Sequence, residues 1–507
     1  MQAAPDTTNP AAPDLSNIQG NVFGGFNKPH QALVYLKFAD AATGKAFLAE
    51  MVDRLTTSQA VFDWKKTYND MFPKDPGIGR HPDPNTEELR AGWINLVLSF
   101  SGLSLLGAPE ADALQPEFKA GMAAAKERIG DKDESDPGNW IDPFKAPGDL
   151  HAMAIIGADT EAIREEQLAA LREVMGTHQV TELGSQIGDI LPEALAGHEH
   201  FGFKDGVSQP SVKGIEAPEG SDEQVDPDQF VLTASGQAPA PAPEPAPSGG
   251  YPEPAPPAPA QTPVWAFEGS YLVYRRLHQN VAGFQQFIGE HAAELGLSPD
   301  NLGSLFVGRY KSGAPLEMTH KEAEEHPGDG FVPGDEETRV ADEAINDFDY
   351  EPQDADGHLV PHAAHIRKVY PRNQKDPGEQ EAERHRILRR GIPYGAPFKP
   401  GEAPYQGQGQ PPADDGTDRG LLFLCYQASI RDQFEFIQQA WVNSPTFPTV
   451  EGGAEAGRDP IISQDVEKPT FHIPSKDKTL ELARWVLTTG GEYFFSPSIS
   501  GLRQLAA

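Results

Sequence analysis

SYLVYRRL at residues 270–277 is the stretch that decides the fold. Its aromatic, β-branched and aliphatic residues predict a strand, and the apolar spacing over 281–295 predicts a helix directly after it. The same order occurs earlier in the chain, where a strand is predicted over 32–38 and an amphipathic helix over 43–55. A strand–helix unit that occurs twice indicates that the chain is built from two similar halves.

The remaining elements continue this pattern in each half. In the first half we expect strands over 93–100 and 152–157 and a helix over 160–175. In the second half GLLFLCYQ at 420–427 predicts a strand, and a helix is expected over 430–441. The pattern favours an α+β fold of two modules with antiparallel sheets, and a cofactor between two such sheets would occupy a natural site.

A proline-rich segment at 235–263 marks the clearest boundary. It holds eleven prolines among 29 residues, and such a segment is extended and exposed because it cannot form a packed core. We expect a linker or surface insertion there, with a recognition motif for a partner as the alternative. The predicted organisation is a disordered arm at 1–14, an N-terminal domain at 15–234, this segment, and a C-terminal domain at 264–507.

The composition limits the class of function. The 507 residues carry a formal net charge of -35, which disfavours nucleic acid and anionic membrane as partners. No apolar run of about 18 residues occurs, so we expect no membrane span. Cys425 is the single cysteine, which excludes an intrachain disulfide and the attachment motif of c-type haem. No signal peptide is visible, so we expect a cytoplasmic protein, with secretion as the alternative.

Eight short motifs follow one another along the chain. They are NIQGNVFGGF at 17–26, GFKDG at 202–206, GSYLVYRRL at 269–277, GRYKSGAPL at 308–316, HAAHIRKVYPR at 362–372, RILRRGIPYG at 386–395, GLLFLCYQASI at 420–430 and DPII at 459–462. In this order they resemble the dye-decolorizing peroxidase family, whose GxxDG signature has the form of GFKDG. The resemblance spans residues 15 to about 500, and the proline-rich segment and residues 396–419 are insertions relative to it.

The resemblance implies a haem b peroxidase with two ferredoxin-like modules, the haem being bound mainly by the C-terminal module. Such an enzyme reduces hydrogen peroxide through an oxoferryl intermediate and oxidises dyes, phenols or other aromatic donors in one-electron steps. The expected partners are hydrogen peroxide and aromatic reductants, and the expected state is a monomer or homodimer. The alternative from another class is a haem-binding or haem-iron delivery protein of the same fold with little turnover. A chlorite-degrading enzyme of the same superfamily and a member without haem are further alternatives.

By the same resemblance, His365 is the proximal ligand of the haem iron. A neutral imidazole leaves the opposite face of the iron open, as a peroxidase requires. Asp459 is the matching candidate for the carboxylate that accepts the second ring N–H and raises the basicity of the ligand. The competing histidines near the motifs are His198, His200, His362 and His385.

Asp205 and Arg389 are the expected catalytic pair on the opposite face. A carboxylate beside a glycine can move the proton of peroxide, although a turn is the commonest use of an Asp-Gly dipeptide. A guanidinium stays charged and can stabilise the departing oxygen. The assignment could slip by one residue to Arg390, which we otherwise expect at a haem propionate or in solvent.

Four further residues are expected to act at or near the haem. Leu421 and Phe423 alternate along a strand and face one side of it. The resemblance places that side over the distal haem face, with plain core as the alternative. Tyr394 and Trp441 resemble residues implicated in surface electron transfer from bulky dyes, with packing as the alternative. Cys425 continues the face of Leu421 and Phe423, where a thiolate ligand is the alternative, but a buried cysteine is usually inert.

Overall fold

A computed structural model describes most of the chain. It covers residues 12–71, 89–192, 195–215, 224–233, 262–317, 346, 348–375, 377–398, 413–450, 452–466 and 468–507. Most of the predicted N-terminal arm and of the proline-rich segment lies outside these residues, so the proposed domain boundaries stay predictions. Within the described part, no helix has the length and apolar character needed to cross a membrane.

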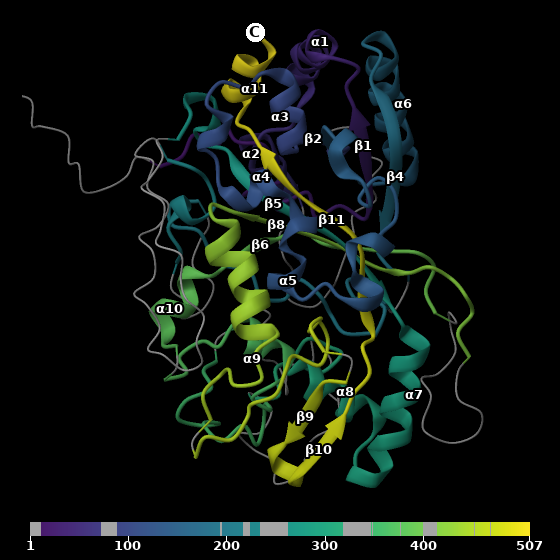
Figure 1. Ribbon diagram of the computed structural model, residues 1–507, viewed down its shortest axis with the longest axis vertical. Coiled ribbons are helices and arrows are strands. Elements are labelled where there is room, and N and C mark those ends of the chain that lie inside the picture. Colours follow the sequence, from purple (N-terminus) through teal and green to yellow (C-terminus); the bar gives the residue numbers. More distant parts are fainter. Residues whose placement is uncertain are drawn as a thin grey trace, which may run out of the picture.

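One long antiparallel sheet organises the molecule (Figure 1). In spatial order its strands are β4 (Thr181–Asp189), β1 (His30–Lys37), β3 (Ala152–Ala158), β2 (Gly92–Leu98), β11 (Val486–Ser496), β5 (Ser270–Gln279), β8 (Gly420–Gln427) and β6 (Leu388–Arg389), and β7 (Ile392–Tyr394) also pairs with β8. A separate hairpin consists of β9 (Thr470–Ile473) and β10 (Lys478–Glu481). The strands predicted from the sequence are therefore confirmed.

Each half of the sheet has the same topology. The short strands β6 and β7 pair with β8 in one register and count here as a single strand. The spatial order is then fourth, first, third and second strand of each half, which is β4-β1-β3-β2 in the N-terminal half and β11-β5-β8-β6 in the C-terminal half. This order, with antiparallel pairing and helical crossovers, is that of a ferredoxin-like module. The predicted α+β class with two such modules is confirmed.

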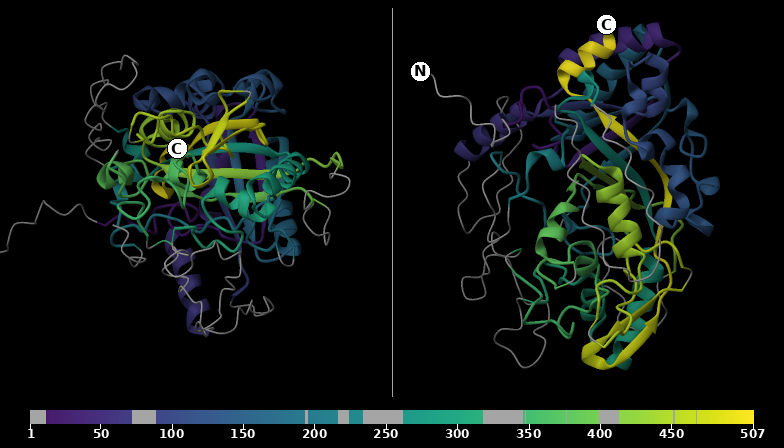
Figure 2. Two further views of the ribbon diagram at one scale, coloured as in Figure 1. Left: turned by 90° about the horizontal axis from the view of Figure 1, so that it is seen from below. Right: turned by 60° about the vertical axis from the view of Figure 1, so that its left-hand side comes forward.

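The two halves join into one body. Leu98 of β2 pairs with Phe495 of β11, and this pair links the two half-sheets. At the opposite ends of the sheet, β4 approaches β7: a Cβ on Gly188 would lie 2.5 Å from Ile392 Cγ2. In the right-hand view of Figure 2, the yellow β11 runs along the length of the molecule and ends below the C-terminal helix at the top. The sequence had predicted the two modules but not their shared sheet.

Helices cover the faces of this sheet. They are α1 (Ala41–Met51), α2 (Ser58–Met71), α3 (Phe100–Leu106), α4 (Pro116–Ala120), α5 (Lys126–Ile129), α6 (Glu161–Thr177), α7 (Val281–Ala292), α8 (Pro299–Val307), α9 (His365–Val369), α10 (Glu379–Arg384) and α11 (Ile499–Ala506). α6 packs on β1, β2 and β3, while α11 brings the end of the chain back against α1 (Figure 1). The C-terminal residues therefore complete the N-terminal half.

Local sequence signals set where several helices begin. Asp40 caps α1 through a capping box, in which its side chain accepts the Thr43 N–H and the Thr43 hydroxyl accepts the Asp40 N–H. Thr160 caps α6 in the simpler way, by accepting the Ile163 N–H. The predicted helix over 430–441 is present but is wound as two π-helical turns, Ile430–Glu435 and Ile437–Val442. Periodicity alone cannot distinguish that winding from an α-helix.

Candidate functional site

The distal candidates come together although they lie 184 residues apart in the sequence. Arg389 Nη1 donates to Asp205 Oδ1 at 3.0 Å, and the two side chains are 30% and 31% exposed. Gly206 also donates its N–H to Asp205 Oδ1, at 2.7 Å. Gly202 and Gly206 have φ of 94° and 73°, a backbone conformation that favours glycine. The glycines of GFKDG thus shape the loop that presents the carboxylate to the guanidinium.

Arg389 is held by the segment that follows the GxxDG signature. Its Nη2 donates to Ser208 O at 2.7 Å. Gln209 accepts the Arg389 main-chain N–H at 3.1 Å and donates to the Arg389 carbonyl at 3.0 Å. Sequence reasoning did not identify Gln209 as a partner of Arg389. The only signal for that role was its position, three residues after Gly206.

Glu199 is a second carboxylate in the distal loop that the sequence did not single out. Its side chain accepts the main-chain N–H groups of Phe201 and Phe203, both at 2.9 Å. Gln279 Nε2 donates to it at 2.5 Å. Burial, with a smaller contribution from the charge of Asp205, raises the pKa of Glu199 to about 7. The Glu199 side chain therefore binds the main chain of the loop that precedes Asp205.

The proximal candidates also meet. His365 is the first residue of α9, and its Nδ1 lies 2.8 Å from Oδ2 of Asp459, which is fully buried. Asp459 Oδ1 accepts the N–H groups of Ile461 and Ile462 at 2.7 and 2.9 Å. An ionised carboxylate only accepts hydrogen bonds, so the ring donates from Nδ1 and keeps the lone pair on Nε2. This is the tautomer that a metal ligand requires.

Lys368 fixes the helix of His365 to the segment that supplies Asp459. Its buried ammonium donates to the carbonyls of Ser444 and Gly457, at 2.7 and 2.8 Å, and also to that of Phe447. Burial lowers the pKa of Lys368 to about 7. Sequence reasoning had not assigned Lys368 any role.

Leu421 and Phe423 form an apolar face on β8. Both are half-buried, whereas Leu422 and Leu424 on the opposite face are fully buried. Like Ile366 beside His365, they pack against one apolar cluster of buried residues. Cys425 is fully buried, and burial raises the pKa of its thiol, so it is an inert core residue.

The structure argues against the expected propionate or solvent position of Arg390. Its guanidinium donates to the carbonyls of Asn21, Val22 and Phe23 at 2.9, 2.7 and 3.1 Å. It also donates to the carbonyl of Arg389 at 2.9 Å. Three of these acceptors belong to the N-terminal motif, which no local sequence pattern could connect to Arg390.

The structure also corrects the surface position expected for Tyr394 and Trp441, since each is only 2% exposed. The Tyr394 hydroxyl donates to Asp418 at 3.3 Å, and the Arg276 guanidinium lies 4.1 Å from the centre of its ring. Trp441 stacks on Phe447 with ring centres 5.1 Å apart. Packing, the alternative interpretation, describes the surroundings of both rings.

Each of the competing histidines contacts at least one main-chain carbonyl. His200 and His362 contact the carbonyls of Tyr394 and Ala355, at 2.8 and 3.1 Å. His198 lies between the carbonyls of Ala196 and Lys311, and His385 contacts the carbonyl of Asp432 and stacks on Phe436. Of the five histidines considered, His365 is the one whose ring contacts a fully buried carboxylate.

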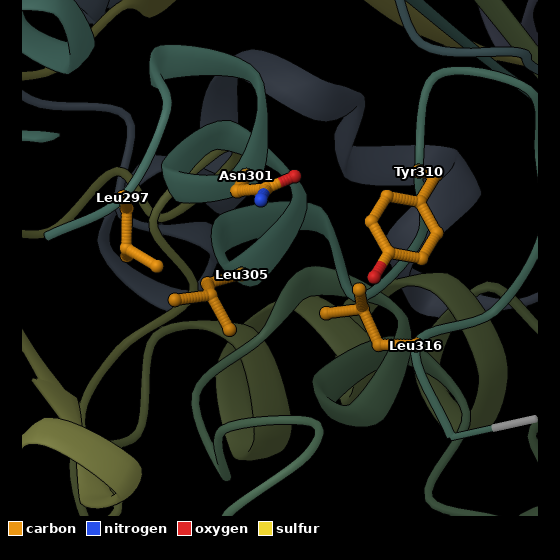
Figure 3. A pocket seen from close by; sticks show the side chains of 5 residues that line it. All are labelled: Leu297, Asn301, Leu305, Tyr310 and Leu316. Carbon is orange, nitrogen blue, oxygen red and sulfur yellow. The ribbon is translucent and has the colours of Figure 1, made fainter. Parts of the chain in front are cut away.

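A small pocket elsewhere in the C-terminal half does not involve these residues (Figure 3). It is lined by Leu297, Asn301, Leu305, Tyr310 and Leu316. Figure 3 shows the leucine side chains and Tyr310 around a narrow space beside α8. The candidate site is therefore the two hydrogen-bonded pairs, and this pocket is not part of it.

The chemistry of these donors fits a haem. One imidazole offers Nε2 while a buried carboxylate holds its Nδ1, which is the donor set of a single axial ligand. A second, partly exposed pair offers a carboxylate and a guanidinium. Leu421 and Phe423 add a half-buried apolar face next to the same cluster as Ile366.

Comparisons with known proteins agree over nearly the whole chain. Residues 17–192 match the DyP dimeric alpha+beta barrel domain, and residues 255–447 match the Dyp-type peroxidase C-terminal domain. A dye-decolorizing peroxidase of Mycena epipterygia is 30% identical, over 97% of this chain and 87% of that protein. The structure of an ancestral D-type dye-decolorizing peroxidase has a TM-score of 0.78 at 31% identity, covering 97% of this chain and 99% of that one.

A further solved structure is a dye-decolorizing peroxidase in complex with 2,6-dimethoxyphenol, with a TM-score of 0.75 at 27% identity, covering 97% of this chain and 99% of that one. These matches favour the peroxidase over the haem-delivery alternative. The chain belongs to the dye-decolorizing peroxidase family, whose members are haem enzymes that reduce hydrogen peroxide and oxidise dyes and phenols.

Proposed function

We propose that Asp205 and Arg389 are the distal catalytic residues of this haem b peroxidase, and that His365, supported by Asp459, is its iron ligand. The observation that carries the proposal is the pairing of each functional group with the partner it needs. Arg389 lies 3.0 Å from Asp205, and His365 lies 2.8 Å from Asp459. When bound, the haem supplies the iron that takes oxidising equivalents from peroxide and passes them on to donors.

Asp205 accepts and returns the proton in this scheme. Its Oδ1 is engaged by Arg389 and Gly206, whereas no hydrogen bond to Oδ2 occurs within the described part of the chain. Oδ2 is therefore the atom we assign to take the proton from one peroxide oxygen and deliver it to the other. Arg389 stabilises the negative charge that develops on the departing oxygen, and it stays charged throughout.

The catalytic assignment is tested by the rate at which the haem-loaded protein reacts with hydrogen peroxide. In stopped-flow measurements of the Soret band, we expect Asp205→Asn to lower the second-order rate constant by about 10²- to 10⁴-fold. Arg389→Leu should lower it by about 10²- to 10³-fold, as loss of an electrostatic donor does. Both variants should still bind haem through His365.

Matched controls separate these effects from the general loss of a charge. Asp226→Asn and Arg384→Leu remove the same side-chain types at exposed ion pairs, with 54% and 42% exposure. We expect the controls to react at the wild-type rate. Asp205→Asn and Arg389→Leu variants that react as fast as the wild type would refute the assignment, and a wild-type spectrum unchanged by peroxide would favour haem delivery instead.

Dyes and phenols are the donors, and we propose that Tyr394 and Trp441 relay electrons from bulky ones. The phenol-bound relative supports a phenolic donor for this chain as well. Because both rings are buried, they could act as relays but not as the sites of contact. A Trp441→Phe variant should lose turnover of a bulky dye while keeping that of 2,6-dimethoxyphenol, and equal losses for both donors would contradict the relay.

The cytoplasmic location and the monomeric or homodimeric state of the protein stay predictions. Cell fractionation tests the location, and light scattering tests the oligomeric state.

A further inference from the structure

Arg390 lies beside the distal arginine but does not face the same groups. Its main-chain N–H donates to Leu424 O of β8 at 2.7 Å, directly after the short strand β6 that carries Arg389. Its half-buried guanidinium turns to the N-terminal motif, where it donates to the carbonyls of Asn21, Val22 and Phe23. The planar guanidinium carries N–H groups on three nitrogens in a fixed arrangement, so it can donate to several carbonyls that lie in different directions.

The acceptor loop is itself rigid. Asn21 donates its main-chain N–H to the side chain of buried Asn95 at 2.8 Å, and its Oδ1 accepts the N–H of Phe26 at 2.8 Å. Gly25 has φ of 66° and packs on Arg390, because a Cβ there would lie 2.9 Å from Arg390 Nε. These hydrogen bonds hold the loop of the acceptor carbonyls in place. Because residue 25 has no side chain, there is room beside it for the guanidinium.

The same guanidinium also holds the main chain of the distal arginine. Arg390 Nη1 donates to the carbonyl of Arg389 at 2.9 Å, and Gln209 donates to that same carbonyl at 3.0 Å. From this main chain the Arg389 side chain reaches Asp205 at 3.0 Å. The position of the catalytic guanidinium thus depends on two anchors, one from the segment after GFKDG and one from residues 21–23.

We propose that Arg390 is a positioning residue for the distal pair: it fastens the main chain of Arg389 to the N-terminal motif and so holds Arg389 on Asp205. The inference rests on the proposed role of Arg389. A displacement of about 1 Å at a reacting group can lower a rate by about 10²-fold, so an anchor of this kind affects the reaction without touching peroxide. It also gives the N-terminal motif a function at the distal site, to which Arg389 comes from the C-terminal half.

The first test is a double-mutant cycle on the haem-loaded protein. Arg390→Lys keeps the charge but not the planar guanidinium, and we expect it to lower the rate constant for hydrogen peroxide by about 10- to 100-fold. In an Arg389→Leu background the same change should alter the rate by less than about twofold, because the group being positioned is gone. Equal factors in the two backgrounds, or no effect in either, would overturn the proposal.

A second readout does not depend on turnover. Fluoride bound to the ferric haem is an anion that the Arg389 guanidinium would stabilise, so its dissociation constant, measured from the visible spectrum, reports the position of that group. Arg390→Lys should raise this constant about 10-fold where Arg389 is present and leave it unchanged in the Arg389→Leu background. A residue that only stabilised the fold would not show this dependence.

Gly25→Ala displaces Arg390 without altering it, and it serves if Arg390→Lys fails to fold. Its matched control is Gly107→Ala, since Gly107 has a similar φ of 69° but no atom within 4 Å of an added Cβ. We expect slower reaction with peroxide for Gly25→Ala and a wild-type rate for the control. Equal rates for these two variants would contradict the proposal. If Arg389→Leu itself reacts like the wild type, the proposed function fails whatever Arg390 does.

Discussion

The proximal pair shows what a single buried carboxylate does for its neighbour. Asp459 accepts the N–H groups of Ile461 and Ile462 with one oxygen and contacts His365 with the other. In Asp459→Asn the side-chain oxygen can keep the two main-chain bonds, which turns the amide NH₂ towards the ring. Two donors would then face each other, so the imidazole moves away and its Nδ1–H loses the anionic acceptor.

We therefore expect Asp459→Asn to lower peroxidase activity by roughly 10- to 100-fold and to raise the midpoint potential of the haem iron. The potential rises because the ring loses the anionic partner that strengthens its donation to the metal. Spectroelectrochemical titration measures the potential, and Asp465→Asn, which alters a partly exposed ion pair with Arg458, is the control. An unchanged potential in Asp459→Asn would mean that the carboxylate does not act through His365.

Sequence reasoning reached the residues with distinctive local settings and failed where the setting is made by distant backbone. Asp205, Arg389, His365 and Asp459 each lie in a short motif, and the structure brings them together in pairs. The partners of Arg390 are carbonyls, which every residue has, so no side-chain pattern could reveal them. The local sequence also does not tell whether an aromatic ring is buried, because an aromatic residue suits both a core and a surface site.

At the scale of the element, β8 packs so closely against β5 that one of its positions has no room for a side chain. Gly420 begins this strand, and a Cβ on it would lie 1.8 Å from the carbonyl oxygen of Leu277 in β5. The same strand carries Leu421 and Phe423 and pairs with β6, which carries Arg389. A displacement of β8 would therefore reach both this apolar face and Arg389.

We expect Gly420→Ala to lower the free energy of unfolding by about 1–3 kcal/mol, the usual cost of overpacking, and to shift the Soret band of the haem-loaded protein. Gly176→Ala is the opposite case, because Gly176 lies in α6 with no atom within 4 Å of an added Cβ. It should raise the free energy of unfolding by about 0.5–1 kcal/mol. Urea titration measures both variants, and a stabilised Gly420→Ala would show that β5 and β8 separate at no cost.

The positions of strands and helices could be predicted from the sequence. The spacing of apolar residues that is typical of a strand or of a helix is a local property of the chain. The π-helical winding of the 430–442 segment could not be predicted, since π-helical turns are short and rare and no residue pattern in this segment marks them. The joining of β2 to β11 could not be predicted either. It rests on one pair, Leu98 with Phe495, between strands almost 400 residues apart in the chain.

At the scale of the whole molecule, β11 unites the two halves. Its neighbours are β5 of the C-terminal half and β2 of the N-terminal half. The hydroxyls of Tyr35 in β1 and Tyr274 in β5 lie 2.8 Å apart and form a second link between the halves. One apolar core includes residues from both, for example Leu33 and Leu424. Separate unfolding of the two modules would expose this shared core, so the described body should unfold as a unit.

Glu492 of β11 makes the stability of the contact between the two halves depend on pH. Its Oε1 accepts the N–H of Met122 from the N-terminal half at 3.0 Å and that of Tyr493 at 2.7 Å. Burial raises the pKa of Glu492 from 4.5 to about 7. Between these values the folded carboxyl keeps a proton that the unfolded chain has lost, so its contribution to stability is complete below about pH 4.5. That contribution is lost as the pH rises through about 7.

Glu492→Gln stays neutral and can keep both main-chain hydrogen bonds. We therefore expect the variant and the wild type to unfold alike at pH 4.5, and the variant to gain by up to about 3 kcal/mol relative to the wild type by pH 8. Denaturant titrations across this range measure the difference, and Glu294→Gln at an exposed position should show no such trend. A difference that is constant with pH would show that Glu492 is ionised in the folded protein, and β11 would then join the two halves through a buried charge.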